Sequence, residues 1–112
     1  MHIFRDPWGV PHIYADTIGD LLFAQGFVHA QERLFQMDAE RRIASGRLSE
    51  VLGEKALPID TLFRTVGLAK IAREIYGKMD EQAKKFVDRY THGINRFIET
   101  AGTYPVEFRL LR

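Results

Sequence analysis

Residues that could carry nucleophilic catalysis are scarce in this sequence of 112 residues. Ser45 and Ser49 are its only serines, and it contains no cysteine. A serine nucleophile needs a histidine and an acid beside it, and neither serine lies in the G-x-S-x-G turn that exposes such a residue. Both serines are therefore interpreted as helix-capping residues. We predict that this chain carries no catalytic residue.

Histidines and carboxylates could instead hold a metal ion. A helix would place His29 and Glu32, three residues apart, on one face. Helical di-iron bundles use the opposite order, Glu-x-x-His, twice over, and that order does not occur here. His2, His12, His29 and His92 are interpreted as hydrogen-bonded structural residues. The sequence predicts no metal site and no cofactor site, and a metal-binding bundle that uses His29 and Glu32 is kept as an alternative.

Arg41, Arg42 and Arg47 form a basic cluster that could bind an anion. Asp38 and Glu40 lie among them, so internal ion pairs are expected. The formal net charge of +1 argues against a dedicated nucleic-acid-binding protein. The chain has no phosphate-binding loop and no run of about 20 apolar residues, which predicts neither nucleotide binding nor a membrane span. The opening residues, MHIFRD, do not resemble a signal peptide.

A long helix over about residues 18–44 is the main element predicted from the apolar pattern. Its inward face repeats in steps of four and three, at Phe23, Phe27, Ala30, Leu34 and Met37. Thr17 is a suitable N-cap, with Asp20 three residues further on, as in a capping box. The apolar arc is wide as far as Phe35, which indicates burial on more than one side.

The first 16 residues predict a β-hairpin. Asp6-Pro7-Trp8-Gly9 suits a type I turn between two short apolar strands, and Pro11 favours an edge position. Two strands alone are only marginally stable in water, and no third strand is evident. Trp8 is expected to pack against a neighbouring element. The hairpin therefore indicates a larger sheet that lies elsewhere.

Three further helices are predicted, over about residues 47–52, 61–77 and 81–101. Asp60 and Asp80 are suitable N-caps for the last two, and Gly102 is a suitable end. The expected fold is mainly α with an N-terminal β-hairpin, divided into a hairpin at 1–16 and a helical lobe at 17–112. The last residues, from Val106, are rich in apolar side chains, which favours a chain that continues.

Several runs of residues resemble the α-chain of the penicillin acylase (penicillin amidase) family. Residues 5–13, RDPWGVPHI, resemble its R-D-x-x-G-V-P-H-I opening, and residues 24–37, AQGFVHAQERLFQM, resemble A-x-G-[YF]-x-x-A-Q-[DE]-R-L-[FW]-Q-M. Arg41-Arg42 with residues 46–53, GRLSEVLG, match R-R followed by G-x-[LV]-x-E-x-L-G. The remaining matches, in order, are Asp60, Arg64, Tyr90, Gly93, Asn95 and residues 105–108, PVEF.

This resemblance implies an N-terminal-nucleophile amidohydrolase with a four-layer αββα core. In the family, a zymogen cuts itself into an α-chain and a β-chain, and the new N-terminal serine of the β-chain attacks a linear amide. Its free α-amine acts as the base. Substrates of the family include acylated β-lactam antibiotics such as penicillin and acyl-homoserine lactones. Several members bind calcium, which makes calcium a candidate cofactor of the intact enzyme.

The resemblance covers only the front of the α-chain, so it places no catalytic, cofactor or metal residue on this sequence. Gly102-Thr103 is the only glycine followed by a hydroxyl residue, and a cut there would leave ten residues, 103–112. The expected partners are the β-chain and the rest of the α-chain of the same precursor, and an acylated amide in the intact enzyme. The isolated chain is expected to be inactive and is a candidate for self-association. The family implies a periplasmic or secreted protein, and the sequence itself does not distinguish this from the cytoplasm. A free-standing helical interaction module without catalytic activity is the alternative.

Overall fold

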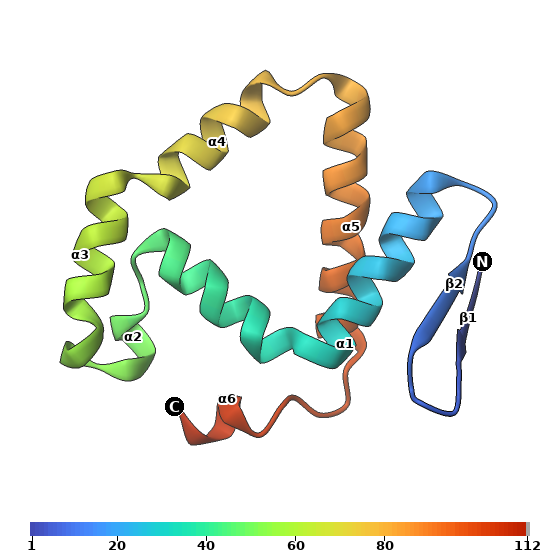
Figure 1. Ribbon diagram of the computed structural model, residues 1–112, viewed down its shortest axis with the longest axis horizontal. Helices are drawn as coiled ribbons and strands as arrows, with labels where there is room; N and C mark the ends of the chain where they lie inside the picture. Colours follow the sequence, from blue (N-terminus) through green and yellow to red (C-terminus); the bar gives the residue numbers. More distant parts are fainter. Residues whose placement is uncertain (112) are drawn as a thin grey trace. The chain divides into compact units, whose positions relative to one another are not determined.

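The structure, a computed structural model, describes residues 1–111 and is mainly helical. Its elements are β1 (His2–Arg5), β2 (Pro11–Tyr14), α1 (Ile18–Ser45), α2 (Ser49–Leu52), the 3₁₀ turn η1 (Glu54–Ala56), α3 (Leu57–Val66), α4 (Leu68–Lys78), α5 (Glu81–Thr100) and α6 (Glu107–Leu110) (Figure 1). The mainly α fold with an N-terminal β-hairpin is confirmed. Within residues 1–111, no helix combines the length and apolar character needed to cross a bilayer.

The contacts within the chain group it into two compact units. Unit 1 contains residues 1–33 and 80–102, so it holds the hairpin, the first part of α1 and α5. Unit 2 contains residues 34–79 and 103–112, with the rest of α1, α2, η1, α3, α4 and α6. The two units are defined by contacts between residues, and each contains two separate stretches of the chain. The predicted division at 1–16 and 17–112 is a different one, because it divides the chain at a single point in the sequence. The boundary inside α1 falls at Arg33, whose φ of −138° and ψ of 25° are not helical.

The hairpin of unit 1 is closed by its predicted turn. β1 and β2 are antiparallel, and Ile3 lies opposite Ile13. The Asp6 carboxylate accepts hydrogen bonds from the N–H groups of Trp8 and Val10, both at 2.9 Å. Gly9 has a φ of 80°, a conformation that glycine adopts without steric cost. Trp8 was expected to pack against a neighbouring element. This prediction is wrong, because Trp8 lies at the tip of the turn and is 89% exposed.

Both long helices of unit 1 start at their predicted caps. The Thr17 hydroxyl oxygen accepts a hydrogen bond from the Asp20 N–H at 3.1 Å, and the hydroxyl donates to the Asp20 carboxylate at 2.9 Å. The Asp80 carboxylate accepts from the Ala83 N–H at 2.8 Å at the start of α5. These local hydrogen bonds satisfy backbone groups that a helix terminus otherwise leaves without partners. The predicted helices at 18–44 and 81–101 are thus found as α1 and α5.

The predicted helix at 61–77 is wrong in its extent, because two helices occupy this part of unit 2. α3 begins at Leu57 with Pro58 in its first turn, where proline's missing N–H costs nothing. Gly67 adopts a left-handed φ of 77° and ends α3, and α4 begins at the next residue. The short helix predicted at 47–52 is found as α2, two residues shorter. A left-handed glycine is a common helix end, and this one divides a continuous apolar pattern.

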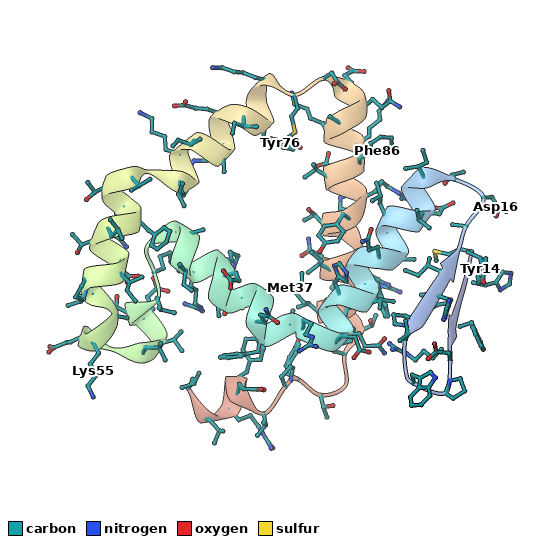
Figure 2. All side chains as sticks on the ribbon, in the orientation of Figure 1. Tyr14, Asp16, Met37, Lys55, Tyr76 and Phe86 are labelled. Carbon is teal, nitrogen blue, oxygen red and sulfur yellow. The ribbon has the colours of Figure 1, made fainter. Side chains whose placement is uncertain are left out.

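The core of the described residues is small and centres on α1. Ala24, Val28, Ala30 and Leu34 of α1 are buried, together with Leu48 and Ala56 in unit 2. Most of these side chains are small, so the helices approach closely without burying large aromatic groups. Many larger apolar side chains remain exposed on the hairpin, α3 and α4. In Figure 2, Tyr14 projects from the side of the hairpin that faces away from α1.

Candidate functional site

The serines and histidines considered as catalytic groups occupy separate structural positions. The Ser45 hydroxyl donates to the Arg41 carbonyl at 2.7 Å, within α1. The Ser49 hydroxyl donates to the Asp60 carboxylate at 2.5 Å. Their interpretation as capping residues is wrong, because Ser45 is the last residue of α1 and the start of α2 is capped from another helix. Within residues 1–111, no hydrogen bond joins either serine to a histidine.

His29 and Glu32 are not brought together as metal ligands. His29 Nδ1 lies 2.9 Å from the Tyr90 hydroxyl on α5, and Glu32 forms an ion pair of 2.7 Å with Arg5. Both side chains are exposed on α1, although the wide apolar arc of this helix predicts burial on more than one side. Among the residues that the structure describes, no group of three or more histidine, aspartate or glutamate side chains could hold a metal ion.

A clamp fastens the hairpin to α1 in unit 1. The Arg5 guanidinium donates to the Gly9 carbonyl at 3.0 Å and to the Gln31 side-chain oxygen at 2.7 Å, and it also pairs with Glu32. At the other end of the turn, His12 Nε2 lies 3.2 Å from the Asp6 carboxylate. One arginine thus connects β1, the turn and the helix. The hairpin is positioned by the same residues that open the family-like motif.

The pKa of Asp6 reflects this turn. Burial raises the pKa of the carboxyl, but the bond with His12 and the two backbone N–H donors outweigh that effect and lower it below its ordinary value. The carboxylate therefore remains ionised under ordinary conditions and keeps the turn closed.

Between the hairpin and α1 lies an open hollow of about 330 Å³. It is lined by Pro11, Ile13, Leu21, Gln25, Val28 and His29. Four of these side chains are apolar, and the polar side chains are the Gln25 amide and the His29 imidazole. No serine lines it. The hollow could hold an apolar group, but it contains no nucleophile with which to act on one.

Two glycines let α1 and α5 touch backbone to backbone in unit 1. A Cβ on Gly26 would lie 2.0 Å from the Tyr90 carbonyl oxygen, and a Cβ on Gly93 would lie 1.9 Å from the Phe23 carbonyl oxygen. Real Cβ atoms are essentially never found this close to other atoms. The contact is flanked by Phe27 and Phe97, whose rings meet edge to face with centroids 5.5 Å apart. Glycine is therefore required at both positions for steric reasons.

In unit 2, a buried carboxylate holds the start of α2. Asp60 is only 4% exposed, and its two oxygens accept from the Leu48 and Ser49 N–H groups at 2.8 and 2.9 Å. Burial by itself raises the pKa of Asp60, but these donors, the Ser49 hydroxyl and the nearby Arg64 charge lower it overall. Asp60 was predicted to cap the following helix. That prediction is wrong, because α3 already begins at Leu57. The Asp60 carboxylate instead accepts hydrogen bonds from the start of α2.

Near Asp60, unit 2 contains a second arginine–carbonyl contact and a network of ion pairs between the end of α1 and α2. Arg64 Nε donates to the Gly46 carbonyl at 2.7 Å. Arg42 bridges Asp38 and Glu50 at 2.8 Å each, and Arg47 also pairs with Glu50, at 2.7 Å. The bond with Asp38 raises the pKa of Arg42, and the bond with Arg47 lowers the pKa of Glu50. The predicted internal ion pairs are found, so these arginines already have carboxylate partners.

Sequence reasoning missed the roles of Arg5, Gly26, Gly93 and Asp60. A detectable signal existed for the glycines, because each lies inside a helix predicted from its apolar repeat, next to one large apolar side chain, Phe27 or Ile94. The roles of Arg5 and Asp60 depend on residues far away along the chain. Taken together, the geometry consists of clamps, close contacts and a buried cap. These contacts hold elements of the described chain in place.

Comparison with known proteins shows which family the chain belongs to. A sequence profile of the penicillin amidase family matches residues 1–112. The chain is 41% identical over 111 residues to the penicillin acylase 2 proenzyme of Pseudomonas sp. (strain SE83), covering 99% of this chain and 14% of that protein. It is 42% identical over 94 residues to the acyl-homoserine lactone acylase QuiP of Pseudomonas syringae pv. tomato, covering 84% of this chain and 11% of the relative.

A solved structure shares the fold. A thermostable penicillin G acylase from Alcaligenes faecalis matches with a TM-score of 0.86 and 27% identity, over 98% of this chain and 60% of that chain. The chain thus spans about one seventh or less of the curated relatives it matches. It belongs to the penicillin amidase (penicillin acylase) family of N-terminal-nucleophile hydrolases.

Proposed function

We propose that this chain is the N-terminal α-chain segment of a penicillin-acylase-like amidohydrolase, and that its role is to act as a scaffold. The intact protein would hydrolyse the linear amide bond of acylated substrates, either β-lactams such as penicillin or acyl-homoserine lactones. The observation that carries the proposal is the match of 99% of the chain to only 14% of a penicillin acylase proenzyme. The contacts support it, because the motif residues of the described chain bind one another.

In the proposed mechanism, the nucleophile belongs to the β-chain. Its N-terminal serine would attack the amide carbonyl, and its own α-amine, whose unperturbed pKa is about 7.7–8.0, would take the proton. The leaving amine then departs, and water releases the acid from the acyl-enzyme. This chain would contribute the helices and the hairpin that support the sheet around that serine. Calcium, if the intact enzyme uses it, would be bound by residues outside those described here.

The proposed partners follow from the same assignment. They are the β-chain and the remaining α-chain of its own precursor, in a periplasmic or secreted enzyme that matures by cutting itself. The exposed apolar side chains of α3 and α4 support such partners, because patches of this kind commonly mark interaction surfaces. They also make the isolated chain a candidate for self-association.

The test compares the isolated 112-residue chain with the product of the complete coding sequence, using a chromogenic phenylacetyl amide and an acyl-homoserine lactone. We expect the complete product to split itself at a Gly–Ser junction and to hydrolyse at least one of the two amides. The isolated chain should hydrolyse neither. Enzyme-like turnover by the isolated chain would refute the scaffold role. A complete product that stays uncut and inactive, together with a 112-residue chain that is monomeric and does not self-associate, would favour a free-standing interaction module.

A further inference from the structure

Arg33 is an arginine of the family-like pattern that has no partner within the described chain. It lies in residues 24–37, the run that resembles A-x-G-[YF]-x-x-A-Q-[DE]-R-L-[FW]-Q-M, at the position where the pattern has arginine. Arg33 is exposed, and among residues 1–111 it forms no hydrogen bond, ion pair or ring contact. Exposure alone is ordinary for an arginine. The other arginines of the pattern, however, behave differently.

The other arginines that the pattern specifies each bind an acceptor within the chain, and they are Arg5, Arg41, Arg42 and Arg64. Arg5 and Arg42 pair with carboxylates at 2.7 and 2.8 Å, and Arg64 donates to a backbone carbonyl at 2.7 Å. A guanidinium has five N–H donors and no acceptor, so only acceptors can hold it in place. Within residues 1–111, Arg33 is the exception to this behaviour.

The backbone at Arg33 has a conformation that its neighbours along the chain do not explain. Its φ of −138° and ψ of 25° interrupt α1. Helix kinks commonly occur at proline, glycine or serine, and residues 27–39 contain none of these. On either side the chain is anchored, because Glu32 is bound to Arg5 and Leu34 is buried. The backbone that carries the Arg33 side chain is therefore fixed, which lowers the entropic cost of binding a partner.

We infer that Arg33 binds a carboxylate from the part of the precursor outside these 112 residues. The inference rests on the proposed function. A carboxylate is the expected acceptor, because it can take two parallel N–H bonds from one guanidinium. The carboxylates close to Arg33 along the chain, Glu32 and Asp38, are already bound by other arginines. The chain matches only 14% of a related proenzyme, so most of the acids of such a precursor lie outside it.

Substitutions at Arg33 test the inference in the isolated chain and in the complete precursor. Arg33→Gln removes the charge and keeps a long polar side chain. In the 112-residue chain it should leave the urea midpoint unchanged, because no partner is lost there. In the complete precursor it should lower the yield of processed enzyme about tenfold or more, because the partner carboxylate is left without its cation. Arg33→Lys keeps the charge and should retain more processed enzyme than Arg33→Gln.

Arg73→Gln is the matched control. Arg73 is an exposed arginine of α4 that lies outside the family-like runs and has no partner among residues 1–111. Its substitution should change neither the urea midpoint nor the yield. Equal yields for Arg33→Gln and Arg73→Gln would refute the inference. A lowered urea midpoint of the isolated Arg33→Gln chain would also refute it, because the role of Arg33 would then lie within this segment.

Zero-length coupling identifies the partner. In the Arg33→Lys precursor, a carbodiimide joins the introduced amine to a carboxylate in contact with it, and mass spectrometry of the digest identifies both peptides. We expect coupling to an aspartate or glutamate outside residues 1–112. Lys70 and Glu74, whose charged groups lie 3.9 Å apart, are the positive control within the chain. Coupling only to an acid within residues 1–112, or no coupling at position 33 while the control pair couples, would overturn the inference.

Two other carboxylates are distinguished by the same variants. Coupling between labelled and unlabelled copies would assign Arg33 to a dimer. Normal yield of Arg33→Gln, with a KM raised about tenfold for a penicillin, which carries a carboxylate, and unchanged for a neutral phenylacetyl amide, would assign it to the substrate. Either result would overturn the assignment to the precursor. Failure of the unaltered precursor to process itself or to hydrolyse an amide counts against the proposed function, whereas coupling tests Arg33 in the folded precursor, cut or uncut.

Discussion

Replacing Gly26 with alanine should destabilise unit 1 although alanine is the better helix former. A Cβ at this position would lie 2.0 Å from the Tyr90 carbonyl oxygen, 2.9 Å from its carbonyl carbon and 3.3 Å from the Ile94 nitrogen. These atoms belong to the backbone of α5, which cannot rotate aside as the end of a side chain can. The methyl group can be accepted only if the two helices move apart.

The expected loss follows from two opposing effects. An ordinary contact begins near 3.4 Å, so α1 and α5 would have to separate by more than an ångström at this point. The separation would loosen the edge-to-face contact of Phe27 with Phe97. Overpacking of this kind costs about 1–3 kcal/mol, with a backbone collision at the upper end, and alanine's helix propensity returns about 1 kcal/mol. We therefore expect a net loss of about 2 kcal/mol in the free energy of unfolding.

Gly77→Ala is the matched control. Gly77 lies inside α4, and a Cβ there meets nothing within 4 Å. Alanine should therefore stabilise the chain by about 0.4–1 kcal/mol. Urea unfolding of the 112-residue chain, followed by circular dichroism at 222 nm, measures both changes. A Gly26→Ala variant as stable as Gly77→Ala would refute the close-contact argument, and Gly93→Ala should behave like Gly26→Ala.

Three further predictions concern unit 2. Asp60→Ala should lower the urea midpoint more than Asp60→Asn, because asparagine can still accept a bond from the Leu48 N–H; equal midpoints would contradict the capping role. The lowered pKa values of Asp60, Asp38 and Glu50 mean that the native state binds fewer protons than the unfolded chain. The unfolding free energy should be constant above about pH 5 and fall below about pH 4, and Asp60→Asn should make that fall shallower in circular-dichroism melts at pH 3–7. Arg42→Lys should cost about 1 kcal/mol in urea unfolding, because an ammonium group cannot bridge both carboxylates as the guanidinium does, and an unchanged midpoint would show the network to be incidental.

The elements that sequence reasoning predicted correctly depend on neighbours along the chain. The turn at Asp6, the cap at Thr17 and the cap at Asp80 each involve residues within four positions of one another. The apolar repeat of α1 is likewise a local pattern. For such features, the type and spacing of the residues contain nearly all of the physical cause, so hairpin, α1 and α5 could be recognised before their surroundings were known.

The features that were missed depend on distant partners or on a single backbone angle. Asp60 looks like a helix cap for the residues that follow, but its carboxylate turns to amides 11 and 12 residues earlier. Gly67 looks like a tolerated glycine in a helix until its φ of 77° is known. Nothing in the pattern of α1 indicated the interruption at Arg33. Such features result from packing, which overrides local preference.

The contacts of the motif residues explain how a specific family resemblance can depend on residues that bind one another. Arg5, Gly26, Gly93 and Asp60 are restricted in type because each meets a partner that only that residue can satisfy: a carbonyl and a carboxylate for Arg5, helix backbone for the glycines, and two amides for Asp60. Restrictions of this kind follow from folding, and they hold whether or not the substrate is bound nearby. A motif made of such residues therefore identifies the family without indicating which substrate a member of the family binds.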